Sequence, residues 1–235
     1  MLYVGTSGYS YKEWKGSFYP AKIPATDMLS YYASRLQAVE LNNTFYRLPQ
    51  KSMIESWKSQ VPDNFRFTMK ASQLITHFKK LKDAGNETRF MLKRFAAFGD
   101  RMGAVLFRLP PDMKKDIKRL ELFLKHLPAD PPAAFQLEDP TWLDDDVFAL
   151  LRSQNCAFSI TDTDEMPLSH INKTADWGYV RLRRVNYSDS ELKEWIVRIQ
   201  AQDWANTFVF FKHEDEGTGP KLAAQFLHLA NPDKS

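Results

Sequence analysis

The chain has 235 residues, 43% of them hydrophobic and 26% charged, with a formal net charge of +3 and an isoelectric point near 8.8. This composition is typical of a globular protein with a full core, and so weak a positive charge does not by itself indicate a nucleic-acid-binding protein. The one cysteine, Cys156, excludes an intramolecular disulfide and a cysteine-based zinc site, and we expect it to be buried. The N-terminal residues lack a basic leader and no membrane-length apolar run occurs, so we expect a cytoplasmic protein with no membrane partner.

Short apolar stretches alternate with helical patterns along the whole chain. Strands are predicted at 2–6, 38–42, 65–70, 104–109, 133–138, 157–162, 179–183 and 207–211. Helices are predicted at 27–36, 52–60, 88–98, 117–126, 144–154, 188–200 and 220–229, and only 164–176 lacks a clear one. Ser188 with Glu191 forms a capping-box pattern at the start of one helix. The alternation predicts one α/β domain over residues 1–235, a (β/α)8 TIM-like barrel with a parallel eight-stranded core.

A charged side chain follows or ends seven of the predicted strands. These residues are Glu40, Lys70, Arg108, Glu138, Asp162, Arg181 with Arg183, and Lys212. Neighbouring strand residues point to opposite faces, so Val39 and Leu41 lie opposite Glu40 and Asn42. In a barrel the apolar phase would face the helices, and the charges would converge at the mouth. A closed ion-pair network that only satisfies a polar interior is the alternative interpretation.

Both signs of charge suit catalysis at the C-terminal face of a barrel, where active sites lie. Glu40, Glu138 and Asp162 are candidate general acids or bases, and Lys70, Arg108, Arg181, Arg183 and Lys212 are candidate anion ligands. Because paired carboxylates can hydrolyse an ester or glycosidic bond without a cofactor, we expect hydrolysis and no cofactor. The histidines lack paired metal-ligand spacing, so no metal site is predicted. His77, beside Thr76, is a candidate for proton transfer, although a hydrogen-bonded loop histidine fits equally well.

The segment after the last predicted strand also favours an anion. It runs from Lys212 and His213 to Pro220 and contains two glycines whose backbone N–H groups could approach a phosphate at the start of a helix. His213 is therefore a candidate ligand. The same glycines could form a simple turn, and the acidic residues 214–216 would repel a phosphate.

The first loops mix aromatic and basic residues. Tyr9, Trp14, Asn42, Tyr46 and Arg47 are candidate substrate contacts, since such loops can stack bases or sugar rings and contact phosphates. They could equally form a hydrophobic lid over the barrel mouth. The leading hypothesis is an enzyme for a phosphate-containing or other anionic small molecule, with no partner protein implied. The alternative is a non-catalytic protein that binds single-stranded nucleic acid, and a sugar-binding barrel has less support from the charges.

The loop motifs resemble one known family. Gly5-Thr6-Ser7-Gly8-Tyr9-Ser10-Tyr11, Val39-Glu40-Leu41-Asn42-Asn43-Thr44-Phe45-Tyr46-Arg47 and Leu106-Phe107-Arg108-Leu109-Pro110-Pro111 are similar to segments of the YecE-like family, also called domain of unknown function 72. The resemblance covers the whole chain, implies a TIM-like barrel and implies no established reaction. The sequence departs from the family's commoner pattern at Gln136, Glu138, Arg183-Arg184 and Lys212-His213, which indicates a divergent subgroup with a different ligand.

Overall fold

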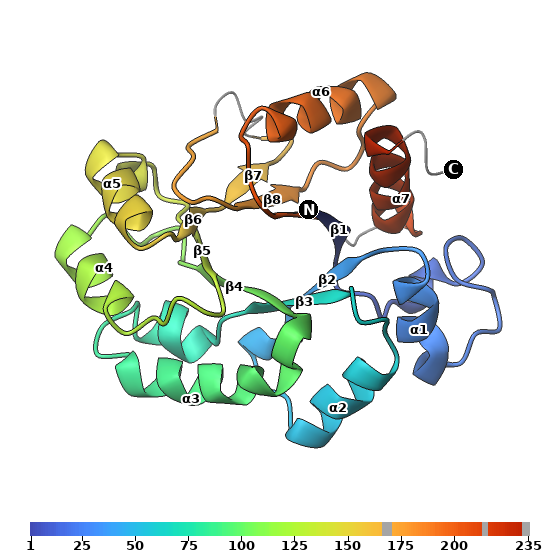
Figure 1. The fold of residues 1–235 in the computed structure, drawn as a ribbon, viewed down its shortest axis with the longest axis horizontal. Helices are drawn as coiled ribbons and strands as arrows, with labels where there is room; N and C mark the ends of the chain where they lie inside the picture. The colour runs from blue at the N-terminus through green and yellow to red at the C-terminus, as the bar shows by residue number, and fades with distance from the viewer. Residues whose placement is uncertain (166–170, 213–215, 232–235) are drawn as a thin grey trace.

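The computed structural model describes residues 1–165, 171–212 and 216–231, which form a ring of strands surrounded by helices (Figure 1). The strands are β1 (Leu2–Ser7), β2 (Ala38–Leu41), β3 (Arg66–Lys70), β4 (Met102–Arg108), β5 (Ala133–Gln136), β6 (Ala157–Phe158), β7 (Ile160–Asp162), β8 (Gly178–Leu182) and β9 (Thr207–Phe211). The α-helices are α1 (Met28–Ala33), α2 (Lys51–Ser59), α3 (Gly85–Phe95), α4 (Ile117–Leu124), α5 (Asp145–Ser153), α6 (Asp189–Gln200) and α7 (Thr218–Ala230). Each predicted helix is present to within a few residues, and the capping box at Ser188 and Glu191 is confirmed.

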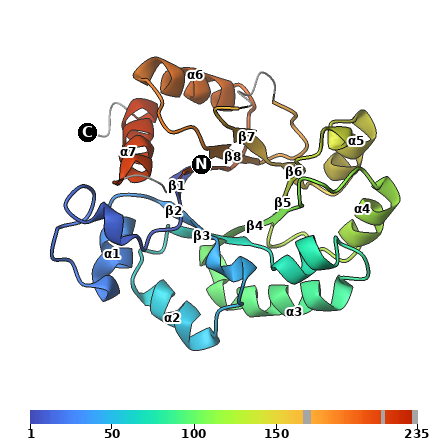
Figure 2. The ribbon, with the colours of Figure 1, turned by 180° about the vertical axis from the view of Figure 1, so that it is seen from behind.

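The sheet differs from the predicted eight-stranded core at the sixth predicted strand, which forms two strands. All strand pairs are parallel, in the order β6-β5-β4-β3-β2-β1-β9-β8-β7. The two edge strands, β6 and β7, are consecutive in the chain and separated only by Ser159. The nine strands therefore form a nearly closed barrel, and both views show the helices around its outside (Figures 1 and 2).

A buried threonine explains why this strand changes neighbours. The hydroxyl of Thr174 accepts a hydrogen bond from the Phe158 N–H at 2.7 Å and donates one to the Cys156 carbonyl at 2.8 Å. A side chain thus satisfies backbone groups of Cys156 and Phe158, at and just before β6. The Ser159 N–H still donates to the Phe135 carbonyl of β5, and pairing with β8 begins one residue later at Ile160.

A cluster of apolar side chains fills the barrel interior around the amino-terminal halves of the strands. We call this cluster the apolar floor. Alanines of β2, β4, β5 and β6 leave room there for aromatic rings of β1, β8 and β9, and Tyr3 stacks on Phe208 with ring centroids 5.2 Å apart. The members of the apolar floor are Tyr3, Ala38, Ala104, Leu106, Ala134, Ala157, Ala175, Trp177, Tyr179, Phe208 and Phe210.

The larger core lies between the strands and the helices. Val39, Phe67, Phe107 and Val180 belong to it, as does Cys156, which is buried as expected. Along each strand, residues of this outer core alternate with residues of the interior, as the period of two requires. Within the described ranges, no helix has the length and apolar character needed to cross a membrane.

Gly5 of β1 offers a test of how closely the strands pack. A Cβ added there would lie 1.8 Å from the carbonyl oxygen of Ala38, a backbone atom of β2 that cannot move freely. We expect Gly5→Ala to lower the free energy of unfolding by more than about 2 kcal/mol in urea denaturation.

Gly85→Ala is the matched control. Gly85 begins α3, where alanine is the better helix former, and the nearest atoms to an added Cβ are those of the exposed His126 ring at 3.1 Å. This change should alter stability by less than about 1 kcal/mol. Equal losses in the two variants would contradict the steric argument.

Candidate functional site

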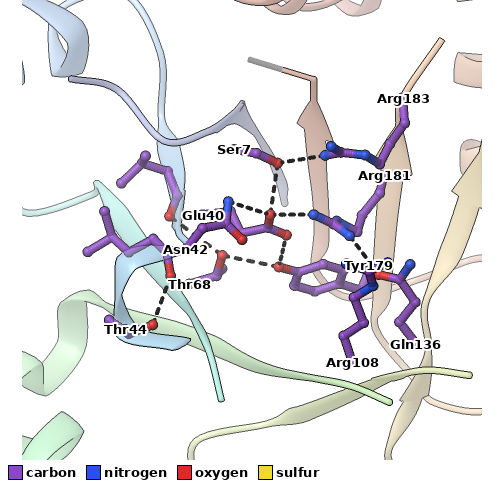
Figure 3. A network of polar contacts seen from close by, with 12 residues as sticks. Ser7, Glu40, Asn42, Thr44, Thr68, Arg108, Gln136, Tyr179, Arg181 and Arg183 are labelled. Atoms are coloured by element: carbon purple, nitrogen blue, oxygen red, sulfur yellow. Dashed lines mark hydrogen bonds and ion pairs between the residues drawn. The ribbon is translucent and has the colours of Figure 1, made fainter. Parts of the chain in front are cut away.

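The charged residues at the strand ends meet above the apolar floor, at the carboxyl end of the barrel. Figure 3 shows Glu40 of β2 at the centre, with side chains from β1 and β8 bound to it and side chains from β3 and β5 bound in turn to those of β8. The predicted convergence at the mouth is therefore confirmed for Glu40, Arg108, Glu138, Arg181 and Arg183, which join one network of polar contacts.

Glu40 and Arg181 form a buried ion pair at the centre of this network. The side chains are 0% and 5% exposed, and the Arg181 Nη2 donates to the Glu40 Oε1 at 2.8 Å. Ser7 and Asn42 donate to the same oxygen at 2.8 Å and 3.3 Å. The Tyr179 hydroxyl donates to Oε2 at 2.7 Å. Four donors therefore hold this carboxylate in place.

These contacts keep Glu40 ionised. Burial by itself raises the pKa of a carboxyl group, but the charge of Arg181 and the hydrogen bond from Tyr179 outweigh it. The pKa of Glu40 falls from 4.5 to about 2. A carboxylate so strongly stabilised accepts a proton poorly at neutral pH, so the structure makes Glu40 an anchor for Arg181 and a weak candidate for acid–base catalysis.

The network continues from Arg181 across the barrel to Arg108. Arg181 Nη1 donates to the side-chain oxygen of Gln136 at 2.6 Å, and the Gln136 amide donates to Glu138 Oε1 at 2.6 Å. Arg108 binds both oxygens of Glu138, from Nε at 2.6 Å and from Nη2 at 3.1 Å. Glu138, the second predicted acid, is thus also held in an ion pair.

Several neutral residues of the network, including Thr68 beside Tyr179, were not among the predicted site residues. Ser7, Tyr179 and Gln136 each lie two positions from another inward-facing residue, and Tyr179 and Gln136 directly precede Arg181 and Glu138 in that phase. The alternation of the strands therefore predicts that these neutral side chains face the interior, whereas the position of charged residues alone does not identify them.

Lys70, at the end of β3, is different from the other charged residues. In the part of the chain that the structure describes, no hydrogen bond or ion pair joins its ammonium group to a protein acceptor, and Nζ lies 4.3 Å from the centroid of the Phe45 ring. Partial burial lowers the pKa of Lys70 most, and Arg108 and Arg181 lower it further, to about 8. The opposing effect of Glu40 is smaller. Lys70 is therefore a half-buried cation still available to a ligand.

His77 lies beside Lys70, in a π-helical turn, η4 (Leu74–Phe78), of the loop after β3. The Phe45 ring packs against the imidazole edge-on, with centroids 4.8 Å apart, and the Thr76 hydroxyl is 2.9 Å from Nδ1. Partial burial and then the charge of Lys70 lower the pKa of His77. The imidazole is consequently neutral near pH 7, the state in which it can accept a proton.

Two further predicted cations, Arg183 and Lys212, directly follow β8 and β9. Arg183 Nη1 donates to the Ser7 hydroxyl at 3.1 Å, and Lys212 is half-buried just after β9. His213 lies outside the described residues. Gly217, before α7, has a left-handed φ of 85°, in keeping with the turn that its sequence predicts.

Asp162 was predicted to lie at the mouth with the other charges, but its carboxylate binds Arg184 and Tyr187, which lie toward α6. Counting from the inward-facing Ala157, it falls in the helix-facing phase with Ile160. Its Oδ2 accepts from Arg184 Nε at 2.9 Å and from the Tyr187 hydroxyl at 2.8 Å. Arg184 also pairs with Glu191 of the capping box, so Asp162 ties β7 to the start of α6.

The aromatic loop residues divide into buried and exposed ones. Trp14 is 0% exposed, packs against Tyr11 and Tyr19 and belongs to the larger core, so it cannot stack on a ligand. Tyr9 is half-buried against Tyr32 of α1, and burial raises its pKa. Tyr46 and Arg47 are exposed beside the mouth. Among the described residues, no three histidine, cysteine or acidic side chains gather as metal ligands.

The buried ion pair can be tested through stability. Glu40→Gln leaves the Arg181 guanidinium buried without its counter-charge, and we expect it to cost about 3–5 kcal/mol of unfolding free energy in urea. Glu138→Gln is the matched control, because its pair with Arg108 is partly exposed and should cost about 1 kcal/mol.

The same pair predicts how stability depends on acid. The pKa of Glu40 is lower in the folded than in the unfolded protein, so its contribution is full above about pH 4.5 and is lost as the pH falls toward 2. The stability difference between the wild type and Glu40→Gln should therefore shrink over that range. A difference that is small at pH 7 or unchanged at pH 3 would contradict the prediction.

Comparisons with known proteins agree with this architecture. UPF0759 protein YunF of Bacillus subtilis (strain 168) is 22% identical over 276 residues, covering 100% of this chain and 96% of YunF. UPF0759 protein YecE of Escherichia coli (strain K12) is 28% identical over 131 residues, which cover 55% of this chain and 46% of YecE.

Solved structures show the same fold. A DUF72 family protein (TM1631) from Thermotoga maritima MSB8 superimposes with a TM-score of 0.85 at 26% identity, covering 97% of this chain and 98% of that one. A DUF72 family protein (ef0366) from Enterococcus faecalis V583 gives 0.77 at 18% identity, covering 98% and 96%. The sequence pattern described as "Protein of unknown function DUF72" matches residues 3–235, and the chain therefore belongs to the DUF72 family, to which YecE-like proteins also belong.

Proposed function

We propose that the protein is an enzyme that binds a small phosphate-containing or other anionic substrate at the mouth of the barrel. The observation that carries this proposal is Lys70, whose half-buried ammonium group has no acceptor among the described residues. A cation withdrawn from water without a counter-charge is stabilised when an anionic ligand binds beside it. The carboxyl end of an α/β barrel is also where substrates are usually bound.

Arg108 can contribute to the same anion site. It donates to Glu138 through Nε and Nη2, so within the described structure Nη1 remains available to a ligand. Glu138 fixes the orientation of the guanidinium plane, and a pre-oriented arginine loses less side-chain entropy when it binds an anion. Lys70 and Arg108 are on neighbouring strands, and the charge of Arg108 lowers the pKa of Lys70, so they could share one ligand.

The geometry favours His77 over the carboxylates for proton transfer. Ester hydrolysis catalysed by Glu40 or Glu138 would first require the release of a carboxylate from its ion pair. His77 is neutral near pH 7 and shares the Phe45 ring with Lys70. We therefore assign binding to Lys70 and Arg108, and proton transfer to His77.

Anion binding tests this function. We expect inorganic phosphate to bind the wild type at low ionic strength in isothermal titration calorimetry, and Lys70→Met to raise the Kd at least about tenfold, or about 1.4 kcal/mol. Lys70→Arg should retain most of the affinity, because it keeps the charge.

Lys93→Met provides the matched control, since Lys93 is exposed on the outer helix α3. It should bind phosphate as the wild type does. If Lys70→Met also binds normally, or if the wild type binds no phosphate at low ionic strength, the anion site is refuted.

Single-stranded nucleic acid is the second candidate ligand, and two exposed rings favour it. Tyr46 and Phe78 are 73% and 72% exposed, in the loops after β2 and β3, and Tyr46 packs edge-on against Phe45. Exposed rings beside a cationic mouth could stack on bases while lysine and arginine contact phosphates.

Oligonucleotide binding separates this candidate from the enzyme. If nucleic acid is the ligand, Tyr46→Ala and Phe78→Ala should each weaken binding of fluorescent oligo-dT by about 1–3 kcal/mol in anisotropy titrations. Phe90→Ala, on the exposed surface of α3, should have no effect. No binding at low salt, or equal losses in all three variants, would dismiss nucleic acid.

A further inference from the structure

We infer that Lys70 captures the carbonyl carbon of a small anionic aldehyde or ketone as an imine. The inference rests on the proposed anion site and deepens it, since it names the substrate class and the atom that reacts. It also replaces ester hydrolysis as the reaction at the mouth. Three features of the structure support it: the freedom of the Lys70 amine from ion pairing, the positive charges around it, and a neutral histidine beside it.

Freedom from ion pairing distinguishes Lys70 from other lysines at this end of the molecule. Lys79, Lys80 and Lys115 lie 2.6 Å, 3.0 Å and 2.7 Å from the carboxylates of Glu87, Asp112 and Asp144. A carboxylate neighbour stabilises the ammonium form, which has no lone pair and cannot attack a carbonyl. Lys70 instead faces the Phe45 ring, and no described carboxylate lies within ion-pairing distance of it.

The charges that face Lys70 favour its neutral form. Arg108 of β4 and Arg181 of β8 act on it more strongly than Glu40 does, and Arg183 adds to their effect. Glu40 is already paired with Arg181, so its charge is largely compensated. A pKa of about 8 leaves about a tenth of the amine unprotonated at pH 7, about 300-fold more than at the ordinary value of 10.5. Desolvation and neighbouring cations are the usual means of activating a lysine nucleophile.

The reaction needs a proton-transfer group, and His77 is placed to supply it. Phe45 packs against both Lys70 Nζ and the His77 ring, so the two groups share one wall of the mouth. Thr76 occupies Nδ1, and Nε2 has no partner within the described residues. A neutral imidazole there can accept a proton at one step and return it at the next.

The chemistry balances without a cofactor. The Lys70 lone pair forms a C–N bond to the carbonyl carbon as the C=O π bond breaks, and His77 Nε2 carries one N–H proton from the nitrogen to the oxygen, giving a neutral carbinolamine. His77 then carries the second N–H proton to the hydroxyl group, the C–O bond breaks with departure of one water molecule, and the nitrogen lone pair completes the C=N bond to Lys70. Arg108 Nη1 binds the carboxylate or phosphate of the substrate and directs its carbonyl toward the amine.

Borohydride trapping tests the inference on the full-length protein. The wild type is incubated with pyruvate, or with glycolaldehyde phosphate, and reduced with sodium borohydride, which converts an imine into a stable secondary amine. With pyruvate, intact mass spectrometry should show a gain of one pyruvic acid less one oxygen atom, and peptide mapping should place it on Lys70. Acetone, a ketone without a charge, should label at least about tenfold less, because it lacks the anion that Arg108 binds.

Lys70→Arg is the decisive variant, since it keeps the charge but cannot form the imine. It should lose the adduct while still binding phosphate, and Lys93→Arg should label as the wild type does. Thermal melting confirms that each variant is folded. Phosphate binding without any adduct on Lys70 overturns the imine and leaves the anion site standing. Labelling spread equally over Lys93 and other surface lysines also overturns it, and loss of both binding and labelling in the wild type refutes the anion site itself.

Discussion

The buried contact between Glu40 and Arg181 is the interaction on which the rest of the mouth depends. Neither charge could remain in a water-free interior alone, because the desolvation cost of an unpaired buried ion is several kcal/mol. Their pairing explains the surrounding neutral residues, since the other lone pairs and N–H groups also require partners. Ser7, Asn42 and Tyr179 serve the carboxylate, and Gln136 serves the guanidinium. The buried pair thus requires hydrogen-bonding side chains at positions on several strands.

This pairing also divides the labour at the mouth. Both carboxylates form ion pairs with arginines, Glu40 with Arg181 and Glu138 with Arg108. The acids predicted to be catalytic therefore orient the arginines. Lys70, which pairs with no acid in the described part of the chain, then has mainly positive neighbours. The chemistry that we propose follows from this imbalance: the mouth would bind an anion, the amine would act as a nucleophile, and a histidine on a loop would transfer protons.

The sequence predicted the architecture better than the contacts, for identifiable reasons. Parallel strands with a period of two place Glu40, Glu138 and Arg181 in one interior, so convergence could be read directly. The same alternation places Asp162 outside the interior, because residues on one face of a strand are an even number of positions apart and Asp162 is an odd number of positions from the inward-facing Ala157. The break at Ser159 could not be foreseen, since it depends on a hydrogen bond from Thr174 in a segment without regular structure. Nor could the partner of each charge, which depends on which strand ends face one another across the ring.

Tyr179 gives the apolar floor an influence on the mouth. Its ring packs among Phe208 and Phe210, while its hydroxyl binds Glu40. The alanines of the floor belong to the same cluster as these rings, so a larger side chain there would press on the ring of Tyr179. A substitution at the bottom of the barrel could therefore move the hydroxyl that holds Glu40, without replacing any residue that a ligand would touch.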